Sequence, residues 1–407
     1  MPAPARPLHL LFSFARGRGH LGPLLPLART ATAAGHTTAL VGVRDVVLEQ
    51  TAFTRLHPRD LPAFADSLAG RPGSGAGTRT GSGPRTGGTG TLLPVDPAKV
   101  LQRVAAIFLG EPAEVARDHV AELLRQDRVD ALVCDGQDFG AMVAAERAGV
   151  PVVVVDVLAT ASDEWVGSIR EPLGRLRADS GLPPGSGLRR IRGDLAVVPF
   201  PPCLRATEDG DGPVVRMRPE PPEPGRDHPA LAWLAAGSEE RRVYVTLGTA
   251  FATASGDLLP RILAGLTALP CRVLVTTGPG LDPAAVAVAS ERVRVERHVP
   301  QDGVLELVDL AVTHGGSGSV MGALARAVPV LVLPLGADQL PNGRRVAELG
   351  CGALLDAATA TPADIGREAS RLLASEAVRR SAERVRRECE SLPPVDEVLR
   401  RIEALAR

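Results

Sequence analysis

The chain has 407 residues, enough for two domains of ordinary size, and 44% of them are hydrophobic. Its formal net charge of −1 and the lack of any apolar run near the roughly 20 residues that span a bilayer exclude nucleic acid and membranes as expected partners. Five scattered cysteines without Cys-x-x-Cys spacing indicate reduced thiols rather than a zinc site. With no visible signal peptide, we expect a soluble cytoplasmic protein.

Strand and helix patterns alternate along the chain, which is typical of a parallel α/β architecture. The first series ends before a Pro-rich stretch, and a second series follows it. We expect strands at residues 8–14, 37–43, 131–134, 152–155, 242–247, 272–276, 293–296, 310–313 and 330–333, and helices at 24–34, 139–148, 304–308, 317–327 and 375–390.

Two changes in composition suggest the domain limits. Residues 70–94 are nearly all Gly, Ser, Thr, Arg and Pro, so we predict a flexible loop there. The Pro-rich residues 206–228 predict a linker between an N-terminal domain, 1–205, and a C-terminal domain, 229–407. The C-terminal helix is a candidate to pack back on the first domain.

The segment 310–319 combines a strand, a Gly-rich turn and a helix start. His314 leads into Gly315 and Gly316, and Ser317 opens the helix. The N-terminus of a helix carries unpaired N–H groups and about half a positive charge, which makes it a natural seat for phosphate. The alternative is a plain strand-to-helix turn with an incidental histidine.

A second polar pair follows the next predicted strand. Asp338 and Gln339 come shortly after residues 330–333. Ligands of doubly wound sheets bind outside the carboxyl ends of the strands, so these side chains should line the same crevice as His314. A phosphate-binding turn beside an acid and an amide side chain is suited to bind a nucleotide that is joined to a polyol.

Residues 17–22, Gly-Arg-Gly-His-Leu-Gly, formally satisfy the G-x-G-x-x-G pattern of dinucleotide sites, and Asp45 lies in range of the ribose. His20 inside the turn and Pro23 early in the helix argue against that reading. A dehydrogenase would also leave the C-terminal motifs unexplained.

Residues 298–351 resemble the donor-binding signature of the UDP-glycosyltransferase superfamily, most of all its bacterial branch that glycosylates polyketide, enediyne, macrolide and related natural products. The resemblance implies the GT-B fold, two Rossmann-like parallel-sheet domains facing each other across a cleft. It also implies an inverting, metal-independent transfer of a sugar from a dTDP- or UDP-sugar to a hydroxyl of a small hydrophobic acceptor.

The N-terminal motif Gly19-His20-x-x-Pro23 matches the loop that holds the general base of that family. A histidine base needs a carboxylate on its far ring nitrogen. Asp135 is the best candidate, because it follows the strand 131–134 on the same sheet edge as the His20 loop. Asp138 is the competitor, and its expected role is to cap the helix that starts at residue 139.

The resemblance implies a set of donor-binding residues. His298 would stack on the base in place of the family's usual aromatic residue, and Gly322 stands where relatives have a Glu that grips ribose, so a dTDP-sugar becomes at least as plausible a donor as a UDP-sugar. The full expected set is Thr249, His298, Val299, Gln301, His314, Gly316, Ser317, Gly318, Ser319, Asp338 and Gln339.

The acceptor is less well indicated, and only Phe108, Phe139 and Trp165 offer apolar contacts. In the family the region of residues 70–94 contributes to the acceptor pocket. Asp209-Gly-Asp211 imitates a metal motif but lies in the Pro-rich linker, so we expect no metal and no cofactor. The protein should be a monomer or a homodimer. The rival hypotheses are another GT-B nucleotide-sugar enzyme, such as a cell-wall transferase or an epimerase, and an inactive GT-B helper subunit.

Overall fold

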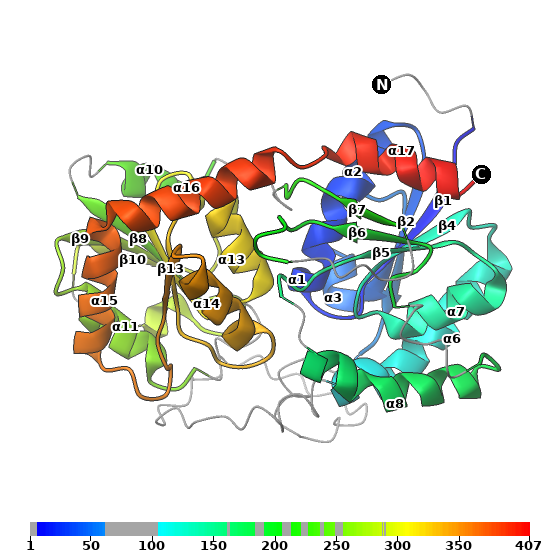
Figure 1. Cartoon of the computed structure of the whole chain (residues 1–407), viewed down its shortest axis with the longest axis horizontal. Coiled ribbons are helices and arrows are strands. Elements are labelled where there is room, and N and C mark those ends of the chain that lie inside the picture. The colour runs from blue at the N-terminus through cyan, green and yellow to red at the C-terminus, as the bar shows by residue number, and fades with distance from the viewer. Residues whose placement is uncertain are drawn as a thin grey trace. The chain divides into compact units, whose positions relative to one another are not determined.

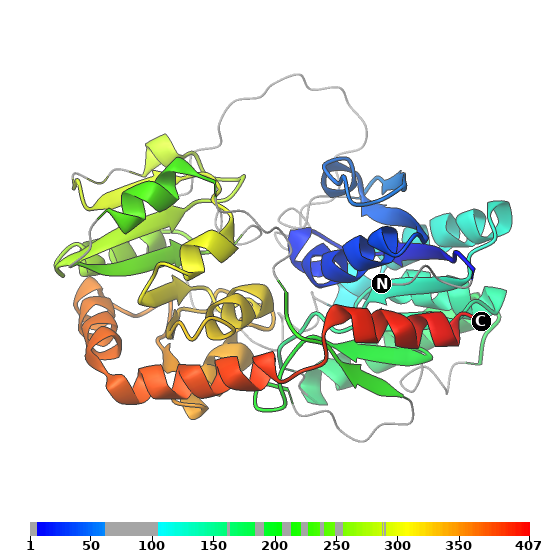
Figure 2. The same ribbon diagram turned by 90° about the horizontal axis from the view of Figure 1, so that it is seen from above.

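The computed structural model describes residues 6–61, 105–160, 163–183, 191–205, 213–220, 227–236, 240–248, 255–286, 288 and 290–407. The chain divides into two compact units (Figures 1 and 2). Of the described residues, unit 1 comprises those within 6–61, 105–220 and 391–407, and unit 2 comprises those within 227–390. Each unit is built around one sheet in which every strand pair is parallel.

The sheet of unit 1 has the strand order β3-β2-β1-β4-β5-β6-β7. The part β3-β2-β1-β4-β5 of this order places β1 and β4 side by side at the point where the strand order reverses, and ligands of such sheets bind outside this point. The strands are β1 (His9–Ser13), β2 (Thr37–Val43), β3 (Arg55–Arg59), β4 (Ala131–Asp135), β5 (Val152–Val155), β6 (Leu195–Val198) and β7 (Val214–Arg216).

Helices cover both faces of this sheet (Figure 1). Successive residues of a strand point to opposite faces, so Leu11 packs into one core cluster and Leu10 and Phe12 into the other. One face is covered by α6 (Glu111–Gln126), α7 (Phe139–Ala148) and α8 (Asp163–Asp179), and the other by α2 (Leu25–Ala33) and α17 (Val395–Leu405). The short helices α1 (Arg18–Leu21), η1 (Gly22–Leu24) and α3 (Arg44–Val47) complete the labelled helices of unit 1.

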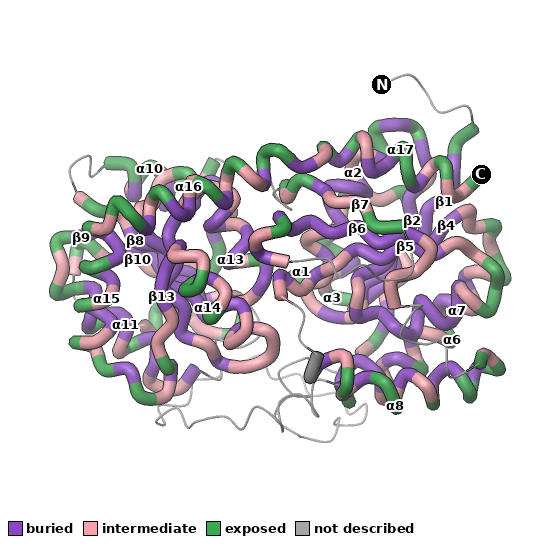
Figure 3. Tube along the Cα trace, viewed as in Figure 1, coloured by how far each residue is buried: buried purple, intermediate pink, exposed green. Residues whose placement is uncertain are grey.

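The sheet of unit 2 has the order β10-β9-β8-β11-β12-β13, and its strands are mostly buried apart from the partly buried edge strand β10 (Figure 3). Its strands are β8 (Arg241–Thr246), β9 (Cys271–Thr276), β10 (Val293–Glu296), β11 (Leu310–Thr313), β12 (Val330–Val332) and β13 (Gly352–Leu354). Its helices are α10 (Pro229–Ala235), α11 (Leu258–Leu266), η4 (Pro283–Ala285), α12 (Gln301–Leu305), α13 (Ser317–Leu324), α14 (Gln339–Glu348), α15 (Pro362–Ala374) and α16 (Glu376–Glu390).

The predicted class of two Rossmann-like parallel-sheet domains is confirmed. One helix was misplaced. The apolar pattern predicts a helix at residues 304–308, but α12 begins at Gln301 because Pro300 at its N-cap already starts the turn. Among the helices of the described segments, none combines the length and the apolarity that a membrane span requires.

The end of the chain belongs to unit 1, so unit 2 stops at residue 390 and not at 407. Helix α17 packs on α2 and β6 because it buries an apolar stripe that includes Val398, Leu399 and Ile402. The predicted linker 206–228 also contains β7, which pairs with β6. An edge strand needs only one partner and three residues here, so a Pro-rich stretch can hold it. The predicted loop at 70–94 lies outside the described residues.

Candidate active site

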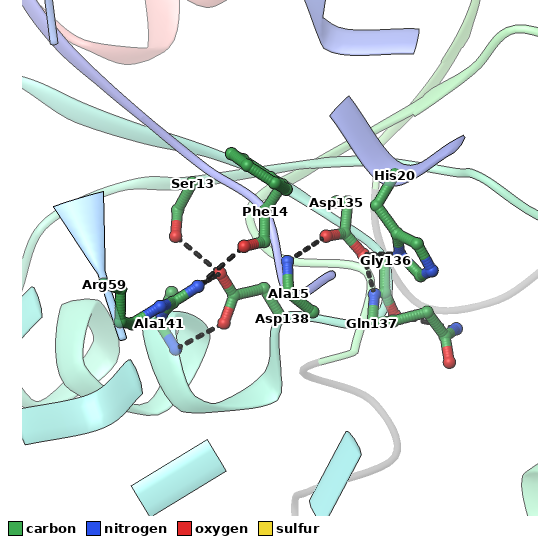
Figure 4. Close-up of polar contacts among 10 residues, drawn as sticks. All are labelled: Ser13, Phe14, Ala15, His20, Arg59, Asp135, Gly136, Gln137, Asp138 and Ala141. Atoms are coloured by element: carbon green, nitrogen blue, oxygen red, sulfur yellow. Dashed lines mark hydrogen bonds and ion pairs between the residues drawn. The ribbon is translucent and has the colours of Figure 1, made fainter. Parts of the chain in front are cut away.

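His20 and Asp135 meet at the carboxyl edge of the unit 1 sheet (Figure 4). His20 lies on α1, directly after the loop that follows β1, and Asp135 is the last residue of β4. The two strands are neighbours, with Ser13 opposite Cys134. This pairing brings the His20 Nδ1 atom to 3.1 Å from the Asp135 Oδ1 atom.

Asp135 is fully buried, and backbone groups hold its carboxylate in one orientation. The Ala15 N–H donates to Oδ2 at 2.6 Å, and the Gln137 N–H donates to Oδ1 at 2.7 Å. A carboxylate can only accept, so the His20 contact requires a hydrogen on Nδ1. In neutral His20 this leaves Nε2 as the proton acceptor, and the side chain keeps 20% of its surface exposed. The pair therefore has the arrangement of a general base and its orienting acid.

Asp138 has the structural role expected of it and does not contact His20 among the described interactions. Its Oδ1 accepts a hydrogen bond from the Ala141 N–H, which caps α7. Its Oδ2 accepts from the Ser13 hydroxyl and lies 3.4 Å from the Arg59 guanidinium. Asp138 is thus buried in a network on the far side of the β1 end (Figure 4).

One of the three predicted aromatic residues, Phe108, lies next to His20. The ring centroids of His20 and Phe108 are 5.2 Å apart, and Phe108 meets Trp165 edge to face at 6.4 Å. Phe108 is therefore the ring beside the imidazole, and Trp165 contacts Phe108. All three side chains belong to one buried core cluster, with exposed fractions of 7% for Phe108, 9% for Trp165 and 1% for Phe139.

A cavity of about 340 Å³ in unit 1 lies beside the amino-terminal end of β5, and its described lining includes neither His20 nor Asp135. An ion pair between the buried Arg177 and the partly buried Glu146 borders it: the Arg177 Nη2 atom lies 3.0 Å from Glu146 Oε1, and its Nη1 atom lies 2.5 Å from Oε2. This edge is opposite to the one that holds Asp135, so we do not connect the cavity with the His20 chemistry.

In unit 2, β11 leads through a tight turn into α13, as the sequence predicts. Gly315 has a φ of +89°, which favours glycine, and a Cβ there would lie 2.5 Å from the Val332 side chain. The first backbone bond of the helix runs from the Val320 N–H to the Gly316 carbonyl. The N–H groups of residues 317–319 thus precede the helical ladder and form the positive end of the helix dipole.

The His314 ring is wedged between two glycines. A Cβ on Gly248 or Gly316 would approach the His314 Nε2 atom to 2.6 Å, so both positions exclude side chains. Burial lowers the pKa of His314 to about 4, although Asp338 and a backbone hydrogen bond at Thr246 act in the opposite direction. His314 is therefore neutral at pH 7 in this state, and the positive potential of the turn comes from the helix N-terminus.

Asp338 is tied to the same turn by a side-chain network. The Ser317 hydroxyl donates to Asp338 Oδ2 at 2.5 Å, and Asn342 Nδ2 donates to the same oxygen at 2.9 Å. Asn342 also donates to the Gly315 carbonyl at 2.9 Å. Asn342 is not among the donor-binding residues expected from the sequence. Its position four residues after Asp338, on the same face of a helix, was the available signal.

The side chain of Gln339 stabilises the loop that precedes it. It is 1% exposed, and its Oε1 atom accepts hydrogen bonds from the Leu335 N–H at 2.6 Å and the Gly336 N–H at 3.1 Å. Both lone pairs of the amide oxygen are used in this way. Only the amide nitrogen is left for the predicted contact with sugar hydroxyls.

The predicted base-side residues lie around the start of α12. His298 is exposed and Val299 is buried. A Cβ on Gly322 of α13 would lie 3.2 Å from the Gln301 Nε2 atom, so the Gln301 amide occupies the space next to the position of the missing acid. Gly316, Ser317, Gly318 and Ser319 form the α13 N-terminus, and Thr249 lies outside the described residues, as do Asp209 and Asp211.

Residues 261–405 match a family model described as the C-terminal domain of erythromycin biosynthesis protein CIII-like proteins. The chain is 31% identical to the elloramycin glycosyltransferase ElmGT of Streptomyces olivaceus, over 94% of each chain. It is 29% identical to 4'-demethylrebeccamycin synthase of Lentzea aerocolonigenes, over 96% of this chain and 97% of the relative. The crystal structure of the glycosyltransferase VinC in complex with dTDP superposes with a TM-score of 0.71 at 21% identity, over 98% of this chain and 99% of VinC.

Proposed function

Because the chain belongs to the bacterial natural-product branch of the UDP-glycosyltransferase superfamily, and so is a glycosyltransferase, we propose that it moves a sugar from a dTDP- or UDP-sugar to a hydroxyl of a small hydrophobic acceptor. The observation that carries this proposal is the His20–Asp135 hydrogen bond of 3.1 Å at the carboxyl edge of the unit 1 sheet. An inactive helper subunit has no need of such a pair, which favours an active enzyme.

In the proposed reaction His20 is the general base. Its Nε2 atom takes the proton of the acceptor hydroxyl while that oxygen attacks the anomeric carbon of the sugar. Asp135 then stabilises the imidazolium through the bond to Nδ1. General-base catalysis of this kind contributes about 10²–10⁴ in rate.

The leaving diphosphate gains negative charge as the bond to the anomeric carbon breaks. We propose that the N–H groups at the start of α13, the Ser319 hydroxyl and His314 stabilise this charge without a metal ion. The support is the chemistry of the turn, where hydrogen-bond donors and the helix dipole converge. A metal-independent reaction follows from this assignment.

The same assignment predicts inversion at the anomeric carbon. If the acceptor oxygen attacks from the face opposite to the diphosphate, the configuration reverses in one step. We propose that Asp338 accepts hydrogen bonds from sugar hydroxyls through Oδ1, since Oδ2 already accepts from Ser317 and Asn342. Holding the sugar in this way aligns the reacting atoms. Phe108 and Trp165 would contact the apolar body of the acceptor beside His20.

The nucleotide preference is expected to depend on Gly322. No carboxylate is available at this position to accept hydrogen bonds from ribose hydroxyls. A nucleotide with deoxyribose should therefore bind almost as tightly as one with ribose. The solved structure of VinC holds dTDP, and we propose the same nucleotide class here.

Replacing Gly322 with glutamate should shift binding towards UDP. The new carboxylate adds acceptors for two ribose hydroxyls, at about 1 kcal/mol for each net hydrogen bond. It must also displace Gln301 and Leu305, whose side-chain atoms would lie 3.2 Å from the new Cβ, so both ligands should lose some affinity. The quantity to measure by calorimetry is therefore the ratio of UDP to dTDP affinity. An unchanged ratio would refute this account of Gly322.

Replacing His314 with alanine should weaken binding of the free nucleoside diphosphate about tenfold to a hundredfold and also lower kcat. The reason is the loss of one hydrogen bond to a charged phosphate, worth roughly 1.5–3 kcal/mol. Titration calorimetry of the diphosphate against both proteins measures the first effect. Equal affinities would place the phosphate elsewhere.

The donor class can be tested by thermal shift with UDP, dTDP, their sugars and NAD. A ligand that binds only the folded protein raises the melting temperature by mass action. We expect dTDP or UDP to raise it and NAD to leave it unchanged. A response to NAD alone would instead support the dinucleotide reading of residues 17–22.

A further inference from the structure

Arg59 is a buried cation at the catalytic edge of the unit 1 sheet. It is the last residue of β3, and its side chain is only 1% exposed. Removing a guanidinium from water is unfavourable unless its hydrogen bonds and charge are matched inside the protein. The partners of Arg59 therefore indicate what this residue does.

The shortest contact of Arg59 is to the backbone and not to a carboxylate. Its Nη2 atom donates to the Phe14 carbonyl at 2.6 Å, whereas Asp138 Oδ2 lies at 3.4 Å (Figure 4). The Nε and Nη1 atoms have no hydrogen-bond partner in the part of the chain that the structure describes. Arg16 nearby is also cationic and buried, and burial, with a smaller effect of Arg59, lowers its pKa to about 10. The Arg59 guanidinium thus makes one short hydrogen bond, to the Phe14 carbonyl, and one longer ion pair, with Asp138.

The Phe14 carbonyl oxygen belongs to the peptide group that holds Asp135. The Phe14 carbonyl and the Ala15 N–H are the two ends of one planar amide. The Ala15 N–H donates to Asp135 Oδ2 at 2.6 Å, and Asp135 Oδ1 contacts His20. A cation on the carbonyl oxygen polarises the amide and strengthens its N–H as a donor. It also keeps the amide from rotating away from the carboxylate.

We propose that Arg59 is a positioning residue that acts through the Phe14–Ala15 peptide to hold Asp135, and through it His20, in the orientation the base requires. The proposal rests on the proposed function of His20. Arg59 touches neither His20 nor Asp135 in the described contacts, so its effect passes through the backbone. The alternative is a purely structural role, in which Arg59 only stabilises the fold through Asp138.

The matched control for Arg59 is Arg177. Arg177 is equally buried in unit 1 and is paired with Glu146, but it borders the opposite edge of the sheet. Arg177→Met should therefore lower the melting temperature and leave kcat unchanged. Arg59→Met removes a charge of the same kind and should lower kcat about tenfold, with KM for the donor unchanged, since a small misplacement of a catalytic group can cost up to a hundredfold.

A second readout does not depend on activity. The hydrogen bond to Asp135 deshields the ring proton on His20 Nδ1 and slows its exchange with water, so this proton should give a downfield NMR signal that is absent from His20→Ala. In Arg59→Met we expect this signal to broaden through exchange with water, while Arg177→Met keeps it. Arg59→Gln, a smaller change, takes the place of Arg59→Met if that protein does not fold.

Folded Arg59→Met with the parental kcat and a sharp His20 signal would overturn the proposal. So would equal loss of kcat in Arg59→Met and Arg177→Met, because that result fits a general effect of stability. An inactive parent whose His20 signal still depends on Arg59 would support the positioning role and reject the proposed function. An activity that depends on His20 but not on Arg59 would support the proposed function and reject the positioning role.

Discussion

Replacing His20 with alanine should reduce kcat by at least about 100-fold, the lower limit for loss of a general base. Affinity for the donor nucleotide should stay near the parental value, because the predicted phosphate and base contacts are all residues of unit 2. Steady-state kinetics with a saturating donor gives the first quantity, and calorimetry with the nucleoside diphosphate gives the second.

His36 offers a matched control for this variant. Its Nε2 atom lies 3.0 Å from Glu403 Oε1, so it is also a histidine paired with a carboxylate in unit 1. It precedes β2, at the amino-terminal edge of the sheet, and its Nδ1 accepts from the Leu8 N–H. His36→Ala should lower the melting temperature without a comparable fall in kcat. Near-parental turnover by His20→Ala would remove His20 from the mechanism.

Asp135→Asn should lower kcat by about 100-fold or more while the protein stays folded. The carboxylate oxygens accept from the Ala15 and Gln137 N–H groups as well as from His20. An asparagine offers one acceptor oxygen, and its NH₂ group would face either a backbone donor or the imidazole. If the NH₂ group faces Nδ1, the proton of neutral His20 moves to Nε2, where it blocks the base.

Asp138→Asn is the comparison that separates the two acids. The asparagine oxygen can still accept from the Ala141 N–H and cap α7, but the second oxygen that now accepts from Ser13 is lost. We expect a lower melting temperature and a much smaller effect on kcat than in Asp135→Asn. The opposite ranking of the two kcat values would mean that the acid of the pair has been misassigned.

Much of the fold could be predicted because the strands are short, apolar and parallel. A parallel sheet buried on both faces gives continuous apolar runs such as 152–155, and the residue after each run lies at one edge. That rule, together with the resemblance of residues 19–23 to the family's loop, paired His20 with Asp135 across 115 residues of sequence. It also placed His314 at the turn before α13.

The rest depends on contacts that leave no periodic pattern. Arg59 contacts a backbone carbonyl 45 residues away and a carboxylate 79 residues away. The sequence pattern at the end of a strand is the same for a buried arginine as for an exposed one. Gln339 closes its own loop through the backbone N–H groups of residues 335 and 336, which sequence alone cannot distinguish from an amide directed at a ligand. The edge strand β7 is too short to stand out from the prolines around it.

The most direct test of the account is analysis of the product formed from α-linked dTDP-glucose or UDP-glucose and hydroxylated polycyclic acceptors in excess EDTA. Mass spectrometry reports whether one glucosyl unit has been added, and the proton coupling at the anomeric carbon reports its configuration. We predict a β-linked glucoside that forms at the same rate with and without EDTA. An α-linked product, or transfer that stops when EDTA is added, would contradict direct attack assisted by His20 and a diphosphate stabilised without a metal.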